Sequence, residues 1–93
     1  MAYWNFFTNY GHVLFVLSQD SCIRVRDLAE RVGITERAAQ KIIHDLEKDG
    51  YIRIKKIGRN NSYTVDGRKK LRHPIEEACR ISELIRVIEK DRN

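Results

Sequence analysis

The order of three patterns between residues 25 and 65 constrains this chain most strongly. A short amphipathic helix is predicted over residues 25–32, and a second, longer helix begins after Thr35 and runs to about residue 49. Gly33 stands between them, where a sharp turn needs the positive φ that glycine adopts without steric cost. An alternating segment and a basic loop follow at once. Two crossing helices followed by a hairpin leave few possible folds.

The second of these helices has one apolar face and one polar face. Thr35 is predicted to cap its first turn. A stripe at three- and four-residue spacing is expected to be buried, and it consists of Ala39, Ile42, Ile43 and Leu46. The opposite side carries side chains that donate hydrogen bonds, namely Arg37, Gln40, Lys41 and His44. An exposed stripe of this kind is suited to contact with a polar partner.

The segment after this helix reads as a β-hairpin. Residues 51–57 alternate, so that Ile52 and Ile54 face inward and Arg53 and Lys55 face outward. A five-residue loop is expected over residues 58–62, because glycine and asparagine tolerate positive φ. Residues 63–65 form the return strand. The combination of helix, turn, helix and hairpin is a winged helix-turn-helix.

The flanking segments complete a single α+β, mainly helical domain over residues 1–93. The helix-turn-helix occupies about residues 25–49, and the wing hairpin about residues 51–65. A first helix is expected over residues 9–19 with Thr8 as its cap, and a short strand over residues 22–24 beside the hairpin. An extra C-terminal helix is expected over about residues 74–90, because Pro74 suits a first helical turn.

Positive charge is concentrated in one part of the chain. The formal net charge is +5, and residues 51–73 hold eight of the 18 Lys and Arg residues with one acid, Asp66. A clustered excess of this kind is typical of a phosphate-binding surface. A solvated basic stretch without a partner is the alternative.

The stretch from Val25 to Pro74 resembles the winged helix-turn-helix transcriptional regulators of bacteria and archaea, the broad MarR/ArsR-like class. The resemblance to its small single-domain members rests on Ile34-Thr35-Glu36-Arg37, on residues 45–52 and on Gly58-Arg59-Asn60-Asn61. It implies that the second helix of the motif lies in the major groove of DNA. It also implies that the hairpin touches phosphate or the minor groove.

Ten residues are assigned to DNA binding on this basis. They are Thr35, Arg37, Gln40, Lys41 and His44 in the helix, and Lys55, Lys56, Arg59, Asn60 and Asn61 in the hairpin. Arg37 and Gln40 can each read a base edge with two hydrogen bonds, whereas Lys41 suits phosphate. Asn60 and Asn61 are equally suited to shaping the turn. The basic residues within 66–73 either reach DNA or are solvated.

Apolar side chains at both ends of the chain predict a homodimer. They are Trp4, Phe6, Phe7, Ile81, Leu84, Ile85 and Ile88. A chain of 93 residues is too small to bury all of them. A symmetric dimer would bind an inverted-repeat operator.

Other function classes lack support. The sequence has no nucleotide-binding, zinc-protease or nucleophile motif, so neither an enzyme nor a cofactor is predicted. Its His and Cys residues have no metal-ligand spacing. Cys22 and Cys79 are expected to be buried, inert thiols in a cytoplasmic protein, with redox sensing as the alternative. The longest apolar run, Val13 to Leu17, is too short for a membrane span.

The sequence therefore predicts a homodimeric, sequence-specific, double-stranded DNA-binding transcriptional regulator. A winged-helix module that binds another protein, or one that binds RNA, is the alternative. The operator, the direction of regulation and any small-molecule effector are not specified by the sequence.

Overall fold

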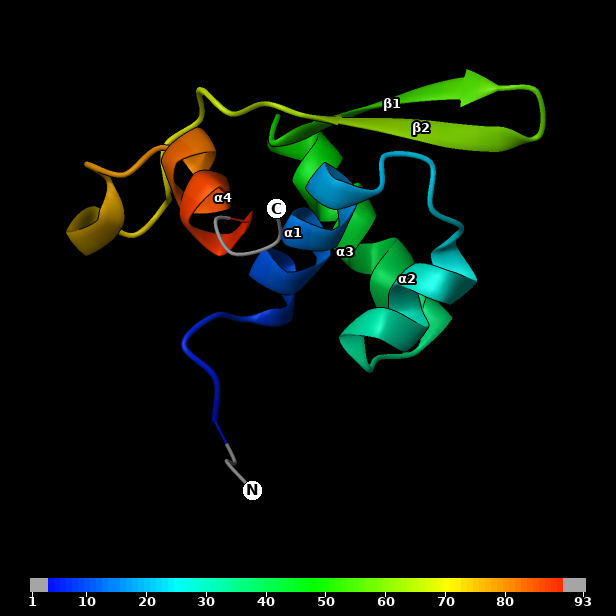
Figure 1. Ribbon diagram of the computed structural model, residues 1–93, viewed down its shortest axis with the longest axis horizontal. Helices are drawn as coiled ribbons and strands as arrows, with labels where there is room; N and C mark the ends of the chain where they lie inside the picture. The colour runs from blue at the N-terminus through cyan, green and yellow to red at the C-terminus, as the bar shows by residue number, and fades with distance from the viewer. Residues whose placement is uncertain (1–3, 90–93) are drawn as a thin grey trace.

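The computed structural model describes residues 4–89 and has the architecture of a winged helix-turn-helix with an additional C-terminal helix. Its elements are α1 (Asn9–Gln19), α2 (Val25–Val32), α3 (Glu36–Lys48), β1 (Ile52–Ile57), β2 (Asn60–Val65), a 3-10 helix η1 (Pro74–Glu76) and α4 (Ile81–Glu89). Helix α1 is central and packs against α2, α3, α4 and β2. In Figure 1 the β1–β2 hairpin projects away from the helices.

The core forms where α1 meets the helix-turn-helix and the base of the hairpin. Leu17, Leu28 and Ile52 are essentially inaccessible to solvent, and they come from α1, α2 and β1. The predicted stripe of α3 is confirmed, because Ala39, Ile42, Ile43 and Leu46 are all buried. Each large aliphatic side chain buried in this way contributes about 1.5–3 kcal/mol. This packing fixes which face of α3 remains outside.

The turn between α2 and α3 has the predicted geometry. Gly33 has φ +88°, and the backbone N–H groups of Gly33 and Ile34 both donate to the Ala29 carbonyl, at 2.8 and 3.0 Å. The hydroxyl oxygen of Thr35 accepts the N–H of Ala38 at 3.0 Å, which confirms the cap of α3. Thr8 is the N-cap residue of α1 as predicted, but its side chain makes no capping hydrogen bond.

The hairpin is tighter than the sequence indicated. Ile57 pairs with Asn60, so the connection is the two-residue turn Gly58-Arg59 rather than a loop over residues 58–62. Gly58 has φ +62° at the first central position, where a type II′ turn needs glycine. Asn60 and Asn61 are therefore strand residues. Residues 22–24 do not form the expected strand; beside them, the Ser21 carbonyl accepts the N–H of Tyr63 at 2.8 Å.

The C-terminal helix begins at Ile81, not near Pro74 as predicted. The intervening segment turns back along the chain and pairs with residues 67–71. Leu71 N–H donates to the Cys79 carbonyl at 3.1 Å, and Ile81 and Ser82 donate to Lys69 and Gly67 at 2.9 Å each. The pairing uses the Cys79 carbonyl and gives partners to the N–H groups of Ile81 and Ser82, which a first helical turn leaves free, and the helix starts at Ile81. The predicted end of the helix, residue 90, lies outside the described residues.

Candidate nucleic-acid interface

The polar face of α3 is open to solvent. Thr35, Arg37, Gln40, Lys41 and His44 are all exposed, on the side of the helix away from its buried stripe. Thr35 has a second role there as the cap, and Glu36 lies in the first turn, where a carboxylate suits the helix dipole. Arg37 and Gln40 project from the first turns of α3. Truncation of either side chain would therefore leave the core intact.

Lys41 is oriented by a carboxylate on its own helix. Its Nζ lies 3.0 Å from Asp45, which also accepts the hydroxyl of Tyr10 on α1 at 2.5 Å. The Tyr10 hydrogen bond, together with that from Lys41, holds the pKa of Asp45 below its ordinary value. Asp45 in turn raises the pKa of Lys41 and of Tyr10. The i,i+4 spacing of Lys41 and Asp45 was readable in the sequence, whereas the contact with Tyr10 was not.

The wing, defined here as the β1–β2 hairpin, presents its basic side chains without partners. Lys55, Lys56, Arg59 and Asn60 are exposed, and Asn61 is half-buried. Lys56 lies opposite Asn61, and Lys55 lies opposite Ser62. The ion pairs found among residues 4–89 include no side chain of the wing. These ammonium and guanidinium groups are therefore free to meet phosphate.

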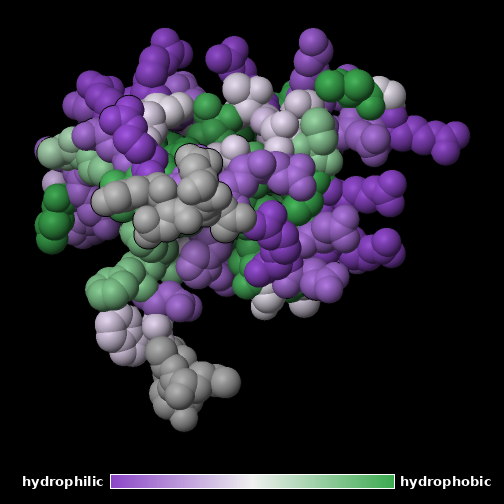
Figure 2. Space-filling view, viewed as in Figure 1, coloured by the Kyte–Doolittle hydropathy of each residue, from purple (hydrophilic) through white to green (hydrophobic). Residues whose placement is uncertain are grey.

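Helix α3 and the wing are adjacent parts of one surface. In Figure 1, α3 runs from the end of α2 to the start of β1, so that both the helix and the wing extend from the same corner of the domain. Long hydrophilic side chains project from the edge of the molecule where α2 and the wing lie (Figure 2).

The basic residues after the wing have partners inside the domain. Arg72 pairs with Asp49 at 2.7 Å, and Arg68 pairs with Asp66 at 3.3 Å. Lys69 lies over the ring of Tyr51, with its Nζ 5.2 Å from the ring centroid. The backbone N–H of Arg68, followed by its guanidinium, lowers the pKa of Asp66. Arg68 and Arg72 remain 84% and 71% exposed in these pairs, so their side chains are solvated as well as paired.

The apolar residues assigned to a dimer interface differ in their accessibility. Trp4 and Phe6 are 68% and 87% exposed, and Phe7 and Ile88 are partly exposed. Leu84 and Ile85 are half-buried. Ile81 is 2% exposed and belongs to the core, so its assignment to the interface was wrong. Its place at the start of α4, against α1, was hidden by the assumption of a longer helix.

Three further exposed aliphatic side chains were not singled out from the sequence. They are Ile57, Ile75 and Val87, which are 56%, 87% and 66% exposed. The thiols also differ from expectation, because Cys22 is exposed and Cys79 half-buried, both unbridged. Cys22 lies in the turn after α1, and Cys79 lies in the paired segment before α4, and neither position is enclosed by the core.

Residues 4–89 contain no group of His, Cys, Asp and Glu side chains that could hold a metal ion. Over the same residues, no helix combines the length and the apolar character that crossing a membrane requires.

Comparison with known proteins agrees with this geometry. Residues 11–53 match the family described as winged helix-turn-helix DNA-binding. The fold is similar to that of the zinc-dependent MarR family transcriptional regulator AdcR in its Zn(II)-bound state, with a TM-score of 0.54 and 23% identity. That match covers 71% of this chain and 47% of the AdcR chain, so this chain spans about half the length of AdcR.

A second similar structure is IscR of T. potens, with a TM-score of 0.66 and 15% identity over 94% of this chain and 90% of that chain. No functionally curated protein matches the sequence. The winged-helix fold read from the sequence is confirmed: residues 11–53 match a winged helix-turn-helix DNA-binding family, and the fold of the chain is similar to those of AdcR and IscR.

Proposed function

We propose that this winged helix-turn-helix DNA-binding protein is a transcriptional regulator that binds a specific duplex sequence as a homodimer. The observation that supports this function best is the exposed face of α3, where Arg37 and Gln40 lie in the first two turns after the Thr35 cap. The first turns of a recognition helix are the part that reaches base edges in the major groove. The role is one of binding rather than catalysis, in the cytoplasm where the DNA of a bacterium or archaeon lies.

The side chains of α3 and of the wing are assigned different roles because they differ in the hydrogen bonds they can make. Arginine can donate two hydrogen bonds to guanine, and glutamine can exchange two with adenine, so Arg37 and Gln40 are assigned to sequence readout. Lys41, Lys55, Lys56 and Arg59 are assigned to phosphate, which sets the register without distinguishing bases. The absence of ion-pair partners on the wing, within the described residues, supports this assignment for Lys55, Lys56 and Arg59, whereas Lys41 lies 3.0 Å from Asp45.

The dimer is proposed from apolar surface that the single chain leaves uncovered. Trp4 and Phe6 in the tail and Val87 and Ile88 on α4 expose large hydrophobic side chains. Large exposed apolar side chains on a small protein mark interaction sites where they gather into a patch, and a second subunit would cover them. A two-fold dimer would place two α3 helices in successive major grooves, roughly 34–36 Å apart, on an inverted repeat.

Selection from randomised duplexes tests this function. We expect the wild-type protein to select two inverted half-sites, and Arg37→Ala and Gln40→Ala each to relax preference at particular base pairs by about 1–3 kcal/mol. Lys48→Ala, an exposed cation near the end of α3, is the matched control and should leave the preferred sequence unchanged. Identical preferences in all four proteins would exclude Arg37 and Gln40 as readers. A wild-type protein without any duplex preference would favour a protein- or RNA-binding role.

A further inference from the structure

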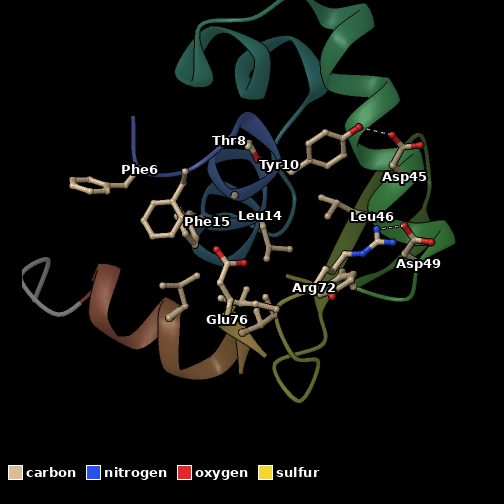
Figure 3. Close-up of a pocket in the computed structure, with 16 residues that line it drawn as sticks. Phe6, Thr8, Tyr10, Leu14, Phe15, Asp45, Leu46, Asp49, Arg72 and Glu76 are labelled. Atoms are coloured by element: carbon tan, nitrogen blue, oxygen red, sulfur yellow. Dashed lines mark hydrogen bonds and ion pairs between the residues drawn. The ribbon is translucent and has the colours of Figure 1, made fainter. Parts of the chain in front are cut away.

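A cleft lies on the side of the domain formed by α1, the end of α3 and α4. Its volume is about 370 Å³. The apolar lining is drawn from the tail, three helices and the segments before β1 and α4, and includes Phe7, Leu14, Phe15, Leu46, Leu71 and Leu84. Figure 3 shows Leu14, Phe15 and Leu46 around the cavity, with the charged side chains Asp45, Asp49, Arg72 and Glu76 beside them. We call this cavity the α1–α4 cleft.

The cleft is suited to an apolar occupant. An enclosed apolar cavity of about 150 Å³ is enough to hold a benzene ring, so this volume has room for two aromatic rings. The charged groups at its edge are largely satisfied within the chain: Asp45 contacts Lys41 and Tyr10, and Asp49 pairs with Arg72. Two of its three carboxylates therefore already have partners, and the remaining lining is mainly hydrophobic.

The N-terminal tail carries two exposed aromatic rings, and one of them, Phe6, lies at the edge of the cleft as a lining residue. Trp4 and Phe6 pack edge-to-face on each other, with ring centroids 5.1 Å apart, and both remain largely exposed. Phe7 is anchored against Phe15 of α1, with ring centroids 5.5 Å apart, at the edge of the cleft. From this anchor the tail leads away from the domain in Figure 1, and the ring of Phe6 points out of the cleft in Figure 3.

We propose that the Trp4–Phe6 pair of each subunit occupies the α1–α4 cleft of a second copy of the chain. The proposal rests on the proposed homodimer and specifies how it is built. One chain carries both the projecting group and a cavity of matching size and polarity, which is the self-complementarity that a two-fold interface requires. Reciprocal exchange would bury both aromatic pairs, and interface aromatics in well-packed pockets dominate the binding energy of such contacts.

Trp4 is the single tryptophan of the chain and reports directly on this contact. The emission maximum and acrylamide quenching of wild-type protein should be followed over a dilution series, in parallel with sedimentation. We expect a blue-shifted emission and roughly twofold or greater protection from quenching in the dimer, because a buried indole loses most of its solvent contact. Phe6→Ala should weaken dimerisation on the order of tenfold to a hundredfold.

A mixing experiment separates docking in the partner's cleft from docking in the chain's own cleft. Leu84→Lys places a charge in the cleft while retaining Trp4, and Trp4→Phe removes the reporter while retaining an intact cleft. Excess Trp4→Phe protein should restore protection to the tryptophan of the Leu84→Lys chain. Arg86→Glu, a charge reversal on the exposed side of the same helix and outside the cleft, is the matched control and should remain protected without mixing. Leu84→Phe, which fills the cleft without charge, replaces Leu84→Lys if the latter fails to fold.

The outcomes distinguish this inference from the function on which it rests. A dimer whose Trp4 stays fully quenchable would overturn tail exchange and leave the dimeric regulator standing. Protection that is independent of concentration, in a monomer, would place the tail in its own cleft and also overturn exchange. A monomer that nevertheless selects a specific duplex would overturn both the exchange and the proposed homodimer, but not sequence-specific DNA binding.

Discussion

The wing and the segment that follows it contain similar numbers of basic residues but use them differently. In the wing, Lys55, Lys56 and Arg59 are exposed and none belongs to an ion pair of the described residues. In the following segment, Arg72 and Arg68 pair with Asp49 and Asp66, and Lys69 covers the ring of Tyr51. The first set has no carboxylate partner, whereas in the second Arg72 contacts the end of α3, Lys69 contacts the residue before β1, and Arg68 pairs within its own segment.

This difference teaches that local charge density does not measure the charge available to DNA. Counterion release depends on cations that reach phosphate, not on all cations present in a stretch of sequence. Asp49 lies 23 residues before Arg72, so a count over neighbouring residues misses its effect. The wing is therefore the part of the basic region that should govern affinity.

Removal of two wing charges should give the largest effect. Lys56→Ala combined with Arg59→Ala is expected to weaken duplex binding on the order of tenfold to a hundredfold, since a hydrogen bond to a charged group is worth about 1.5–3 kcal/mol. The slope of log K against log salt should flatten by roughly 0.9 for each lost contact. Arg68→Ala combined with Arg72→Ala changes the net charge equally and should leave that slope unaltered. Equal slopes for the two double variants would remove the distinction between the regions.

Replacement of Gly58 should disturb the wing through its backbone. Gly58→Ala places a Cβ on a residue with φ +62°, which we expect to destabilise the protein by about 1 kcal/mol or more. No atom lies within 4 Å of the added Cβ, so the cost is conformational rather than steric crowding. Asn60→Ala, beside the same turn, is the control for urea denaturation. A stability equal to wild type for Gly58→Ala would contradict the tight turn.

The ion pair of Arg72 should contribute modestly to folding. Both partners are partly solvated, with side chains of Arg72 and Asp49 that are 71% and 40% exposed. We therefore expect Arg72→Ala to lower the free energy of unfolding by less than about 1 kcal/mol. Lys56→Ala should not lower it at all, because Lys56 has no ion-pair partner in the described residues. Chemical denaturation of both variants measures this difference. A larger loss of unfolding free energy in Lys56→Ala than in Arg72→Ala would contradict it.

The smallest expected effect is a pH dependence at Asp66. Its pKa is lowered in the folded protein by the backbone N–H and the guanidinium of Arg68, at 3.0 and 3.3 Å. The resulting stabilisation is present above the unfolded pKa, near 3.9, and is lost as pH falls through the lower folded value. Asp66→Asn should reduce the acid sensitivity of the melting temperature below about pH 4, and Asp20→Asn is the control for removing a carboxylate. Unchanged acid sensitivity in Asp66→Asn would show that this contact does not form in solution.

The sequence predicted those elements whose determinants are local. The bounds of α1 and α2 and the start of α3 followed from apolar spacing, from Gly33 and from the Thr35 cap. The length of the hairpin loop was overestimated. Asn60 and Asn61 tolerate the conformations of turn residues, and nothing in their identities shows that they pair as strand residues. The start of α4 was misplaced because residues 79–82 pair with residues 67–71 at a distance in sequence.

The candidate site likewise contains features that local sequence predicts and features that depend on distant contacts. Exposure of Arg37, Gln40 and Lys41 was predictable, since helical periodicity separates them from the buried stripe. The partners of Arg72 and Lys69, and the contact of Tyr10 with Asp45, depend on how distant elements pack. Ile81 was assigned to the surface for the same reason, because its burial depends on where α4 begins and on what it meets.

The hydrogen bond between Tyr10 and Asp45 has a thermodynamic consequence. Asp45 borders the α1–α4 cleft and also holds Lys41 on the face of α3. Whatever fills the cleft and alters the Tyr10–Asp45 contact changes the freedom of Lys41 to meet phosphate. Linkage makes the relation reciprocal: if assembly strengthens DNA binding by some factor, DNA strengthens assembly by the same factor. Subunit association and operator occupancy would then be coupled through one surface carboxylate, with protein concentration acting as the signal.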